Sequence, residues 1–336
     1  MAGFRKDFIN CFGFISNFLT TKQLISWSKL SLLLPVYHTI SDQELPHISG
    51  LYCVKNTLAF EKDLDYLLKY FKPINLDQLM EKHEGENQFK HPSFLLTFDD
   101  GLSEFHDVIV PILERKGLTA ICFLNSAFID NKALFYRYKA SVLINHLQQH
   151  PKSLNALSDA LQNTRHFKKL LLGISYQDRQ IFDHMANKLE VDFNQYLKER
   201  QPYLNSEQIN SLLKKGFHFG AHSVDHPEYQ HLVLKDQVHQ TTKSVDYVCK
   251  NFNLKERLFA FPFTDYGVGN EFFEYIKKAN VVDLSFGSAG LKKENIKTHL
   301  QRVPFEMENL TAKKILKSEM LYTGLRKIAS KDMIVR

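Results

Sequence analysis

Two adjacent carboxylates end an apolar run in Ser-Phe-Leu-Leu-Thr-Phe-Asp-Asp-Gly, residues 93–101. The run predicts a strand that is covered on both faces. Asp99 and Asp100 then stand at its carboxyl end, where parallel α/β folds usually place their chemistry. Gly101 permits a tight exit from the strand. Because neighbouring carboxylates repel each other unless a cation or a proton separates them, the pair indicates a metal site.

A second apolar run, residues 217–221, leads into two histidines that stand four positions apart. His222 and His226 can converge on one point from a helix or a compact loop, and Pro227 follows directly. Two imidazoles and one carboxylate leave coordination positions open for water and substrate. This ligand set is typical of a catalytic metal site and not of a closed structural one.

Taken together, Thr-Phe-Asp-Asp-Gly at 97–101 and His-Ser-x-x-His-Pro at 222–227 resemble motifs of the polysaccharide deacetylase family, the NodB-homology domain of carbohydrate esterases. The resemblance covers roughly residues 33–305. It implies a distorted (β/α) barrel that removes acetyl groups, mostly from N-acetylated sugars, with a divalent metal. By motif position, Asp99 resembles the catalytic base, whereas Asp100, His222 and His226 resemble the metal ligands.

The later motifs of the family are altered in this sequence. The third motif usually carries an arginine two residues before its proline, and Ala260 stands at that place. Arg302, from the next expected strand, is a candidate to supply the missing guanidinium. A backbone N–H near Phe263 is the candidate donor of an oxyanion hole, at the family's aromatic position.

The sequence is less informative about the proton donor. The family's tryptophan motif is absent, since Trp27 is the only tryptophan and comes too early. The late histidine that acts as general acid in the family has no clear match, and His299 is the nearest candidate, outside the usual Leu-x-His setting. His38, at the end of the first expected strand, either lines the site or is a hydrogen-bonded structural histidine.

These residues fit the hydrolysis of an acetamide. A divalent metal can lower the pKa of bound water to near ~7 and polarise the carbonyl. Asp99 can take the proton of that water. Two histidines and one aspartate suit zinc and tolerate cobalt, nickel or manganese. Taken singly, each motif has a structural alternative: Asp-Asp-Gly is commonly a turn, and a lone histidine often only satisfies a carbonyl.

Three functions are compatible with this pattern. The first is a metal-dependent carbohydrate deacetylase that cleaves acetamide C–N bonds of an acetylated oligo- or polysaccharide. The second is a relative that binds glycans with little or no turnover, because the later motifs are degraded. The third is an esterase that removes O-acetyl groups with the same metal site.

The surrounding elements predict an α/β fold, a distorted (β/α) barrel of the NodB-homology type with a helical insertion. A strand at 93–98, a helix at 103–116 and a strand at 118–124 form a βαβ unit, which requires a parallel sheet. We expect a helical extension at 1–29, a barrel at 30–325 and an insertion at about 130–203. Tyr136, Arg137 and Tyr138 in the insertion are expected to pack rather than to bind ligands.

The composition restricts the classes of binding partner and the cellular location that we expect. The 336 residues carry a net charge of +6 without a dense basic run, which argues against nucleic-acid binding. The four cysteines are far apart, so a disulfide framework is not expected. No apolar segment reaches the ~20 residues of a transmembrane span. The apolar spacing at 4–19 predicts an amphipathic helix that packs on the barrel or touches a membrane surface. Because this segment is not a convincing signal peptide, a cytoplasmic or membrane-peripheral location is favoured.

Overall fold

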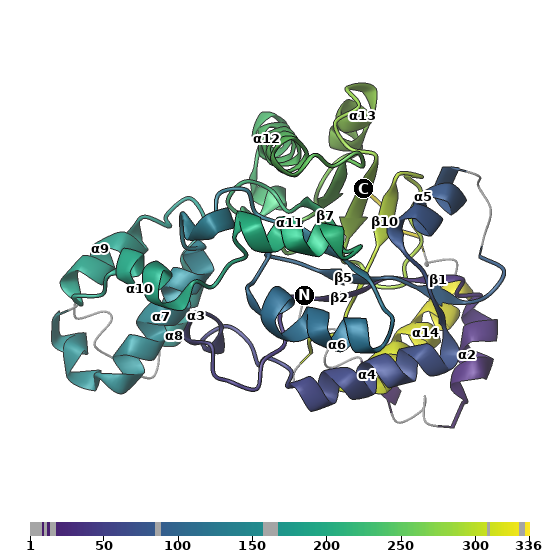
Figure 1. Ribbon diagram of the computed structural model, residues 1–336, viewed down its shortest axis with the longest axis horizontal. Helices are drawn as coiled ribbons and strands as arrows, with labels where there is room; N and C mark the ends of the chain where they lie inside the picture. Colours follow the sequence, from purple (N-terminus) through teal and green to yellow (C-terminus); the bar gives the residue numbers. More distant parts are fainter. Residues whose placement is uncertain are drawn as a thin grey trace.

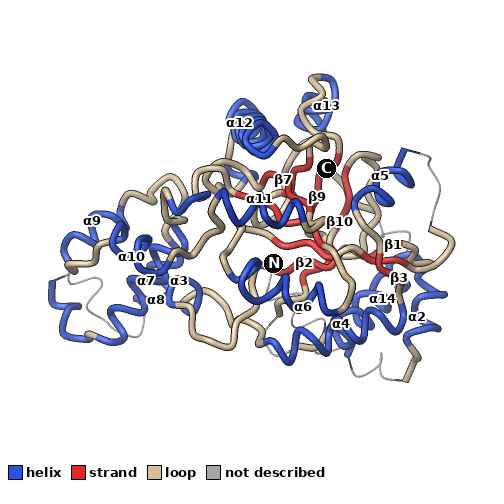
Figure 2. The backbone as a smooth tube through the Cα atoms, in the orientation of Figure 1, coloured by secondary structure: helices blue, strands red, loops and turns tan. Residues whose placement is uncertain are grey.

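The fold is built around one parallel sheet that curves into a barrel (Figures 1 and 2). The structure, a computed structural model, describes residues 9, 12–13, 18–84, 89–156, 167–307, 310–328 and 333–336. Within these residues the strand order is β10-β9-β8-β7-β6-β5-β2-β11, and every neighbouring pair is parallel. The strands are β2 (Pro35–Tyr37), β5 (Leu96–Phe98), β6 (Ala120–Leu124), β7 (His218–Ala221), β8 (Leu258–Ala260), β9 (Leu284–Gly287), β10 (His299–Gln301) and β11 (Val303–Pro304).

One short segment nearly closes the barrel. β10 pairs with β9 at one end of the sheet, and β11 pairs with β2 at the other. Only Arg302 separates β10 from β11, so this residue stands where the chain passes from one end of the sheet to the other. The predicted NodB-type barrel of parallel strands is thereby confirmed.

Below the barrel strands a smaller parallel sheet joins their amino ends. It has the order β1-β4-β3 and consists of β1 (Leu32–Leu33), β4 (Ser93–Phe94) and β3 (Lys72–Pro73). The expected first strand is therefore divided at Leu34 and the Asp-Asp strand at Leu95, where each chain moves from one sheet to the other.

Helices cover the outside of the barrel. They are α2 (Thr21–Ser28), α4 (Thr57–Tyr70), α5 (Leu76–Glu84), α6 (Val110–Arg115), α11 (Ser206–Lys214), α12 (Leu234–Phe252), α13 (Asn270–Lys278) and α14 (Ala312–Ile328). The helix expected at 103–116 begins with a π-helical turn, η1 (Phe105–Ile109). Pro111 in the first turn of α6 lacks the N–H that a regular helix would use there.

The core has an inner and an outer layer because side chains alternate along each strand. Inside the barrel lies one hydrophobic cluster, which includes Leu95, Phe123, Ala260 and Phe286. The opposite faces of the same strands pack against the helices in a larger cluster, which includes Phe98. Asp99, one residue beyond Phe98, therefore belongs to the face that looks into the barrel.

The helical insertion lies between β6 and β7 and has its own core. It contains η2 (Ile129–Asn131), α7 (Tyr136–Gln149), η3 (Pro151–Ala156), α8 (Phe167–Gly173), α9 (Ile181–Lys188) and α10 (Phe193–Arg200). α3 (Pro46–Ser49) packs against α7, where the Gly50 N–H donates to Ser141 Oγ at 2.9 Å. In Figure 1 these helices gather at one end of the molecule, and α2 and α14 at the other.

Most of the expected amphipathic helix at 4–19 lies outside the described residues. Within the described part of the chain, no helix is long and apolar enough to cross a membrane.

A buried carboxylate ties three elements together beneath the barrel. Asp63 of α4 forms an ion pair with Lys55, accepts a hydrogen bond from the Tyr37 hydroxyl at 3.2 Å, and accepts another from the Ala312 N–H at 2.6 Å. Asp63 and Lys55 are 2% and 6% exposed, so neither charge has water as an alternative partner. The pair is therefore stabilising only while both partners are present.

We expect Asp63→Ala to lower the free energy of unfolding by about 3–5 kcal/mol, because Lys55 is left buried without its counter-ion. Urea unfolding followed by far-UV circular dichroism measures this change. The matched control is Asp65→Ala on the same helix, whose side chain is 65% exposed and pairs with Lys116. That variant should change the unfolding free energy by less than about 0.5 kcal/mol. Equal losses in the two variants would contradict the role of Asp63.

Candidate metal centre

The three expected metal ligands meet at the carboxyl ends of two barrel strands. Asp100 follows β5, and His222 follows β7. Asp100 and His226 have positive φ angles of 70° and 63°, so each turns its side chain sharply out of the chain direction. Gly101 has a φ of 64°, and a Cβ there would lie 2.6 Å from Leu124 Cδ2. Glycine is therefore required where the chain leaves the Asp-Asp pair.

The ligand atoms of the triad Asp100, His222 and His226 lie within 4.8 Å of one another. Asp100 Oδ1 is 3.2 Å from His226 Nε2 and 3.7 Å from His222 Nε2. All three residues are buried, at 5%, 1% and 4% exposure. Asp100 Oδ1 and His222 Nε2 have no hydrogen-bond partner. Because buried polar atoms rarely stay unpaired, convergent lone pairs of this kind fit a bound divalent cation.

The protonation of His222 suits this role. Its Nδ1 bonds to the Ala260 carbonyl oxygen at 2.9 Å, which places the ring proton on Nδ1 and leaves the Nε2 lone pair free to bind a metal. Burial lowers the pKa of His222 to about 4, against the opposing pull of Asp99 and Asp100. His222 is therefore neutral at pH 7, the form that ligates metals.

Asp99 is held by a guanidinium beside the triad, and its Oδ2 lies 3.9 Å from His222 Nε2. Arg302 Nη1 donates to Asp99 Oδ1 at 2.6 Å, and Nη2 donates to Oδ2 at 2.8 Å. Arg302 is 1% exposed and also donates from Nε to the Gly287 carbonyl. Burial by itself would raise the pKa of Asp99, but the Arg302 charge and hydrogen bond lower it overall. The contact expected of Arg302 is thus present, and it keeps Asp99 ionised.

Ala260 explains why a guanidinium can arrive from another strand. Ala260 lies in the barrel interior at the position where relatives usually carry arginine. Its small side chain leaves the interior open to Arg302, whose guanidinium lies 5.3 Å from the centre of the Phe123 ring.

His38 lies next to Asp99 across the sheet. Tyr37 and Phe98 are paired residues of β2 and β5, so the residues that follow them are neighbours. His38 Nδ1 lies 2.7 Å from Glu306 Oε2, and 35% of its side chain is exposed. Burial tends to lower the pKa of His38, but the bond to Glu306 and the charges of Glu306, Asp100 and Asp99 raise it to about 9. His38 is thus protonated at neutral pH and partly open to solvent, beside the expected base.

Phe263 borders the triad. Its ring centre lies 4.6 Å from that of His226, and 43% of the residue is exposed. Phe263 has a φ of 55°, and its carbonyl accepts a hydrogen bond from Ser288 Oγ at 3.1 Å. The structure therefore places this residue at the rim of the metal centre, and its role as an oxyanion donor stays a prediction.

His299 does not join the other candidates. Its ring is 1% exposed, its Nδ1 lies 2.8 Å from Ser285 Oγ, and its Nε2 lies 3.1 Å from Asp265 Oδ2. Both nitrogens are occupied by partners outside the triad, so His299 is not placed to protonate a leaving group. This geometry does not support the expectation that His299 serves as general acid.

The insertion contributes directly to the metal centre, which the sequence did not predict. Tyr138 of α7 donates a hydrogen bond to Asp100 Oδ2 at 2.8 Å, the oxygen that faces away from the histidines. Tyr176 donates to Asp225, between the two histidine ligands, at 2.7 Å to Oδ2. A single tyrosine has no spacing signal, so these contacts depend on the folded arrangement. Tyr138 holds the expected ligand Asp100 from outside, as supporting residues of metal sites do, and Tyr176 holds the loop between the two histidines.

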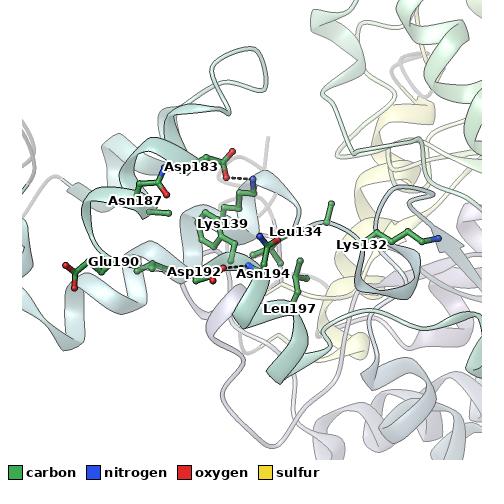
Figure 3. Close-up of a pocket in the computed structure, with 13 residues that line it drawn as sticks. Lys132, Leu134, Lys139, Asp183, Asn187, Glu190, Asp192, Asn194 and Leu197 are labelled. Carbon is green, nitrogen blue, oxygen red and sulfur yellow. Dashed lines mark hydrogen bonds and ion pairs between the residues drawn. The ribbon is translucent and has the colours of Figure 1, made fainter.

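A separate cavity of about 610 Å³ lies within the insertion (Figure 3). Its wall includes Lys139, which pairs with Asp183 at 2.6 Å, and Asp192, which accepts a hydrogen bond from the Asn194 N–H at 2.8 Å. No triad residue lines this cavity. Leu134 does, and the next residue, Phe135, has its ring centre 4.4 Å from that of His226.

Comparisons with known proteins agree with this geometry. The family model described as polysaccharide deacetylase matches residues 86–281, more than half of the chain. A search of curated proteins finds no match. The fold resembles deacetylase PplD of Streptococcus pyogenes, solved in complex with acetate (TM-score 0.56, 14% identity, 86% of this chain and 97% of that one). It also resembles IcaB of Ammonifex degensii (0.52, 14%, 86% and 97%) and the polysaccharide deacetylase BC0361 of Bacillus cereus (0.53, 12%, 86% and 68%). At these identities the structures show a shared fold.

We expect the purified protein, after reconstitution with zinc, to hold about one divalent ion per chain, because the orphaned atoms form one site. His222→Ala and His226→Ala should lose it. Tyr138→Phe should keep the site but weaken the affinity about 10–100-fold, since the outer oxygen of Asp100 loses its donor. Elemental mass spectrometry and titration against a competing chelator measure these changes.

Tyr136→Phe is the matched control for the tyrosine. Tyr136 lies two residues away on the same helix, and its buried hydroxyl has no hydrogen-bond partner. Its affinity should equal that of the wild type. An equal loss in both phenylalanine variants, or a wild type that binds no metal, would refute this account of the site.

Proposed function

Because this chain belongs to the polysaccharide deacetylase family, we propose that it is a divalent-metal-dependent hydrolase that cleaves acetamide C–N bonds in an acetylated glycan. The observation that carries the proposal is the position of Asp99. Arg302 donates a hydrogen bond to each oxygen of this carboxylate, whose Oδ2 lies 3.9 Å from His222 Nε2, beside the three convergent ligand atoms. A base separate from the metal ligands is what water activation requires.

The cation would be held by Asp100, His222 and His226, and when bound it would polarise the acetyl carbonyl and lower the pKa of the attacking water. Asp99 accepts the proton that this water loses, and Arg302 fixes the direction of its two oxygens. His38 gives its proton to the sugar nitrogen as the C–N bond breaks. An amine and acetate are then released, Asp99 loses the proton it accepted to solvent, and His38 regains one from solvent, so that one water is consumed and the enzyme is restored.

His38 also favours amide over ester cleavage. An amine is a poor leaving group unless its nitrogen is protonated, so an amidase needs a donor that is still charged at neutral pH. The ion pair with Glu306 keeps His38 in that form. The acetate held by Streptococcus pyogenes PplD is the product expected of such a reaction. N-acetylated sugars are therefore the leading substrates, and O-acetyl esters the alternative.

Asp99→Asn should lower kcat for acetate release from N-acetylglucosamine oligomers by about 10²–10⁴-fold, because the amide cannot accept the proton. Its metal content should equal that of the wild type, since Asp100 and both histidines are intact. Coupled acetate detection and elemental mass spectrometry give the two readouts. Asp65→Asn, an exposed aspartate, serves as the control and should keep full activity.

The same assay distinguishes the alternatives. Acetate release from an O-acetylated xylan oligomer alone would favour the esterase. Binding of N-acetylated oligomers without acetate release under any divalent metal would favour a glycan-binding protein. Full activity in Asp99→Asn would contradict the assignment of the base.

The proton donor predicts a particular pH dependence. Activity should fall as the pH rises past about 9, because His38 loses its proton there. Glu306→Gln removes the contact that raises this pKa, so the basic limb should move to lower pH by more than about one unit. The dependence of kcat on pH between about 6 and 10 measures the limb. Glu114→Gln, which removes an exposed partner of Lys215, should leave it in place. A basic limb that does not move in Glu306→Gln would exclude His38 as the donor.

A further inference from the structure

The loop that carries Phe263 to the metal centre is anchored from behind by a buried arginine. Asp265, two residues after Phe263, is 2% exposed. Its Oδ2 accepts hydrogen bonds from Arg336 Nη2 at 2.7 Å and from Gln301 Nε2 at 2.8 Å. Asp265 thus joins this loop to two distant parts of the chain.

Arg336 occupies a site built for a guanidinium. Its Nη2 also donates to Glu294 Oε2 at 2.6 Å, and its Nη1 donates to the carbonyl oxygen of Asp265 at 3.1 Å. The guanidinium lies 4.4 Å from the centre of the Phe273 ring, and only 5% of the side chain is exposed. Two carboxylates, a main-chain carbonyl and an aromatic face are the groups that recognise arginine.

The segment that delivers Arg336 is itself attached to the fold. Met333 forms a parallel bridge with Lys293, and the Ile334 N–H donates to the Lys293 carbonyl at 2.9 Å. Glu294 directly follows Lys293 in the chain, so these contacts place Arg336 beside Glu294. The attachment therefore joins residues 333–336 to the Phe263 loop through Asp265.

Asp265 is connected to the metal centre through Ser288 and Phe263. Asp265 Oδ1 accepts the Ser288 N–H at 3.1 Å, and Ser288 Oγ donates to the Phe263 carbonyl at 3.1 Å. The Phe263 ring then contacts the His226 ring. Gly287 makes the close approach possible, because a Cβ there would lie 2.6 Å from Asp265 Cγ.

We propose that Arg336 is a positioning residue: it locks the loop at 262–268 through Asp265 and thereby fixes Phe263 against the metal centre. The consequence for turnover rests on the proposed function, whereas the consequence for the loop does not. His299 belongs to the same anchor, since its Nε2 contacts Asp265 as well. Among the described residues, loss of the guanidinium leaves only Gln301 Nε2 and His299 Nε2 in contact with both Asp265 and Glu294, and the loop should move away.

Hydrogen–deuterium exchange of peptides covering 262–268 tests the lock without any substrate. We expect Arg336→Ala to speed amide exchange in this loop about tenfold or more, because local opening becomes easier. Peptides of β5 and β6 should keep the wild-type rate. Arg336→Lys should fall between the two, since one ammonium cannot make both contacts. Arg257→Ala, which removes a surface arginine paired with Asp246, should leave the loop unchanged.

Steady-state kinetics provides the second arm. Arg336→Ala should lower kcat about 10–100-fold with little change in KM, since a displaced loop costs orientation in the reacting complex. About 10 mM guanidinium should restore part of the activity, and the same concentration of sodium chloride should not.

The exchange experiment and the kinetic experiment can each contradict the proposal in a distinguishable way. Unchanged loop exchange in Arg336→Ala would refute the lock, whatever the activity. Faster exchange with wild-type kcat would show an anchored loop that does not position Phe263 for turnover, which also overturns the proposal. A wild type that releases no acetate would refute the proposed function, and the exchange experiment would still decide whether Arg336 holds the loop.

Discussion

Two carboxylates that are adjacent in the sequence are buried together, and the rest of the site depends on keeping them apart. Asp99 and Asp100 are 4% and 5% exposed, so water does not separate their charges. The chain gives each a different set of partners. Asp99 takes a bidentate guanidinium, whereas Asp100 takes a tyrosine hydroxyl on one oxygen and turns the other toward two imidazoles. The positive φ of Asp100 turns the two side chains in different directions, so that one stays bound to Arg302 while its neighbour faces the two imidazoles.

The guanidinium reaches Asp99 because of the way in which the barrel closes. Arg302 lies between β10 and β11, where the chain leaves one end of the sheet and joins the other. From this junction it faces the interior, donates to the Gly287 carbonyl, and meets Asp99 over the ring of Phe123. The family motif that this sequence resembles has an arginine at the place of Ala260, and here a guanidinium reaches Asp99 from the junction of β10 and β11 instead. The guanidinium that the altered motif lacks at Ala260 is therefore supplied by Arg302, which lies close in space but later in the sequence.

The sequence predicts the parts that depend on short-range order. The alternation and the apolar runs place Asp99, Asp100, His222 and His226 at strand ends, and the structure brings the three ligands together there. It predicts less well what depends on long-range contacts. Tyr138 lies 38 residues from the carboxylate it supports, and Glu306 lies 268 residues from His38. His299 shows the opposite failure: a histidine near the expected place in the sequence has its ring turned toward Ser285 and Asp265. Position along the chain identifies strand ends, but only packing decides which way a side chain faces.

This distinction explains why the metal centre cannot be assigned to the barrel alone. The strands bring the ligands to one edge, but the groups that fix their orientation come from the insertion and from the loops behind them. Tyr138 and Tyr176 act from the insertion on Asp100 and on the His222–His226 loop, while Asp265 and Ser288 act on Phe263 from the far side. Ligand side chains at strand ends are free to rotate unless such contacts hold them. Rotation of these side chains lowers both metal affinity and turnover. The insertion therefore supports the candidate metal centre, and removing it should impair metal binding even if the barrel stays folded.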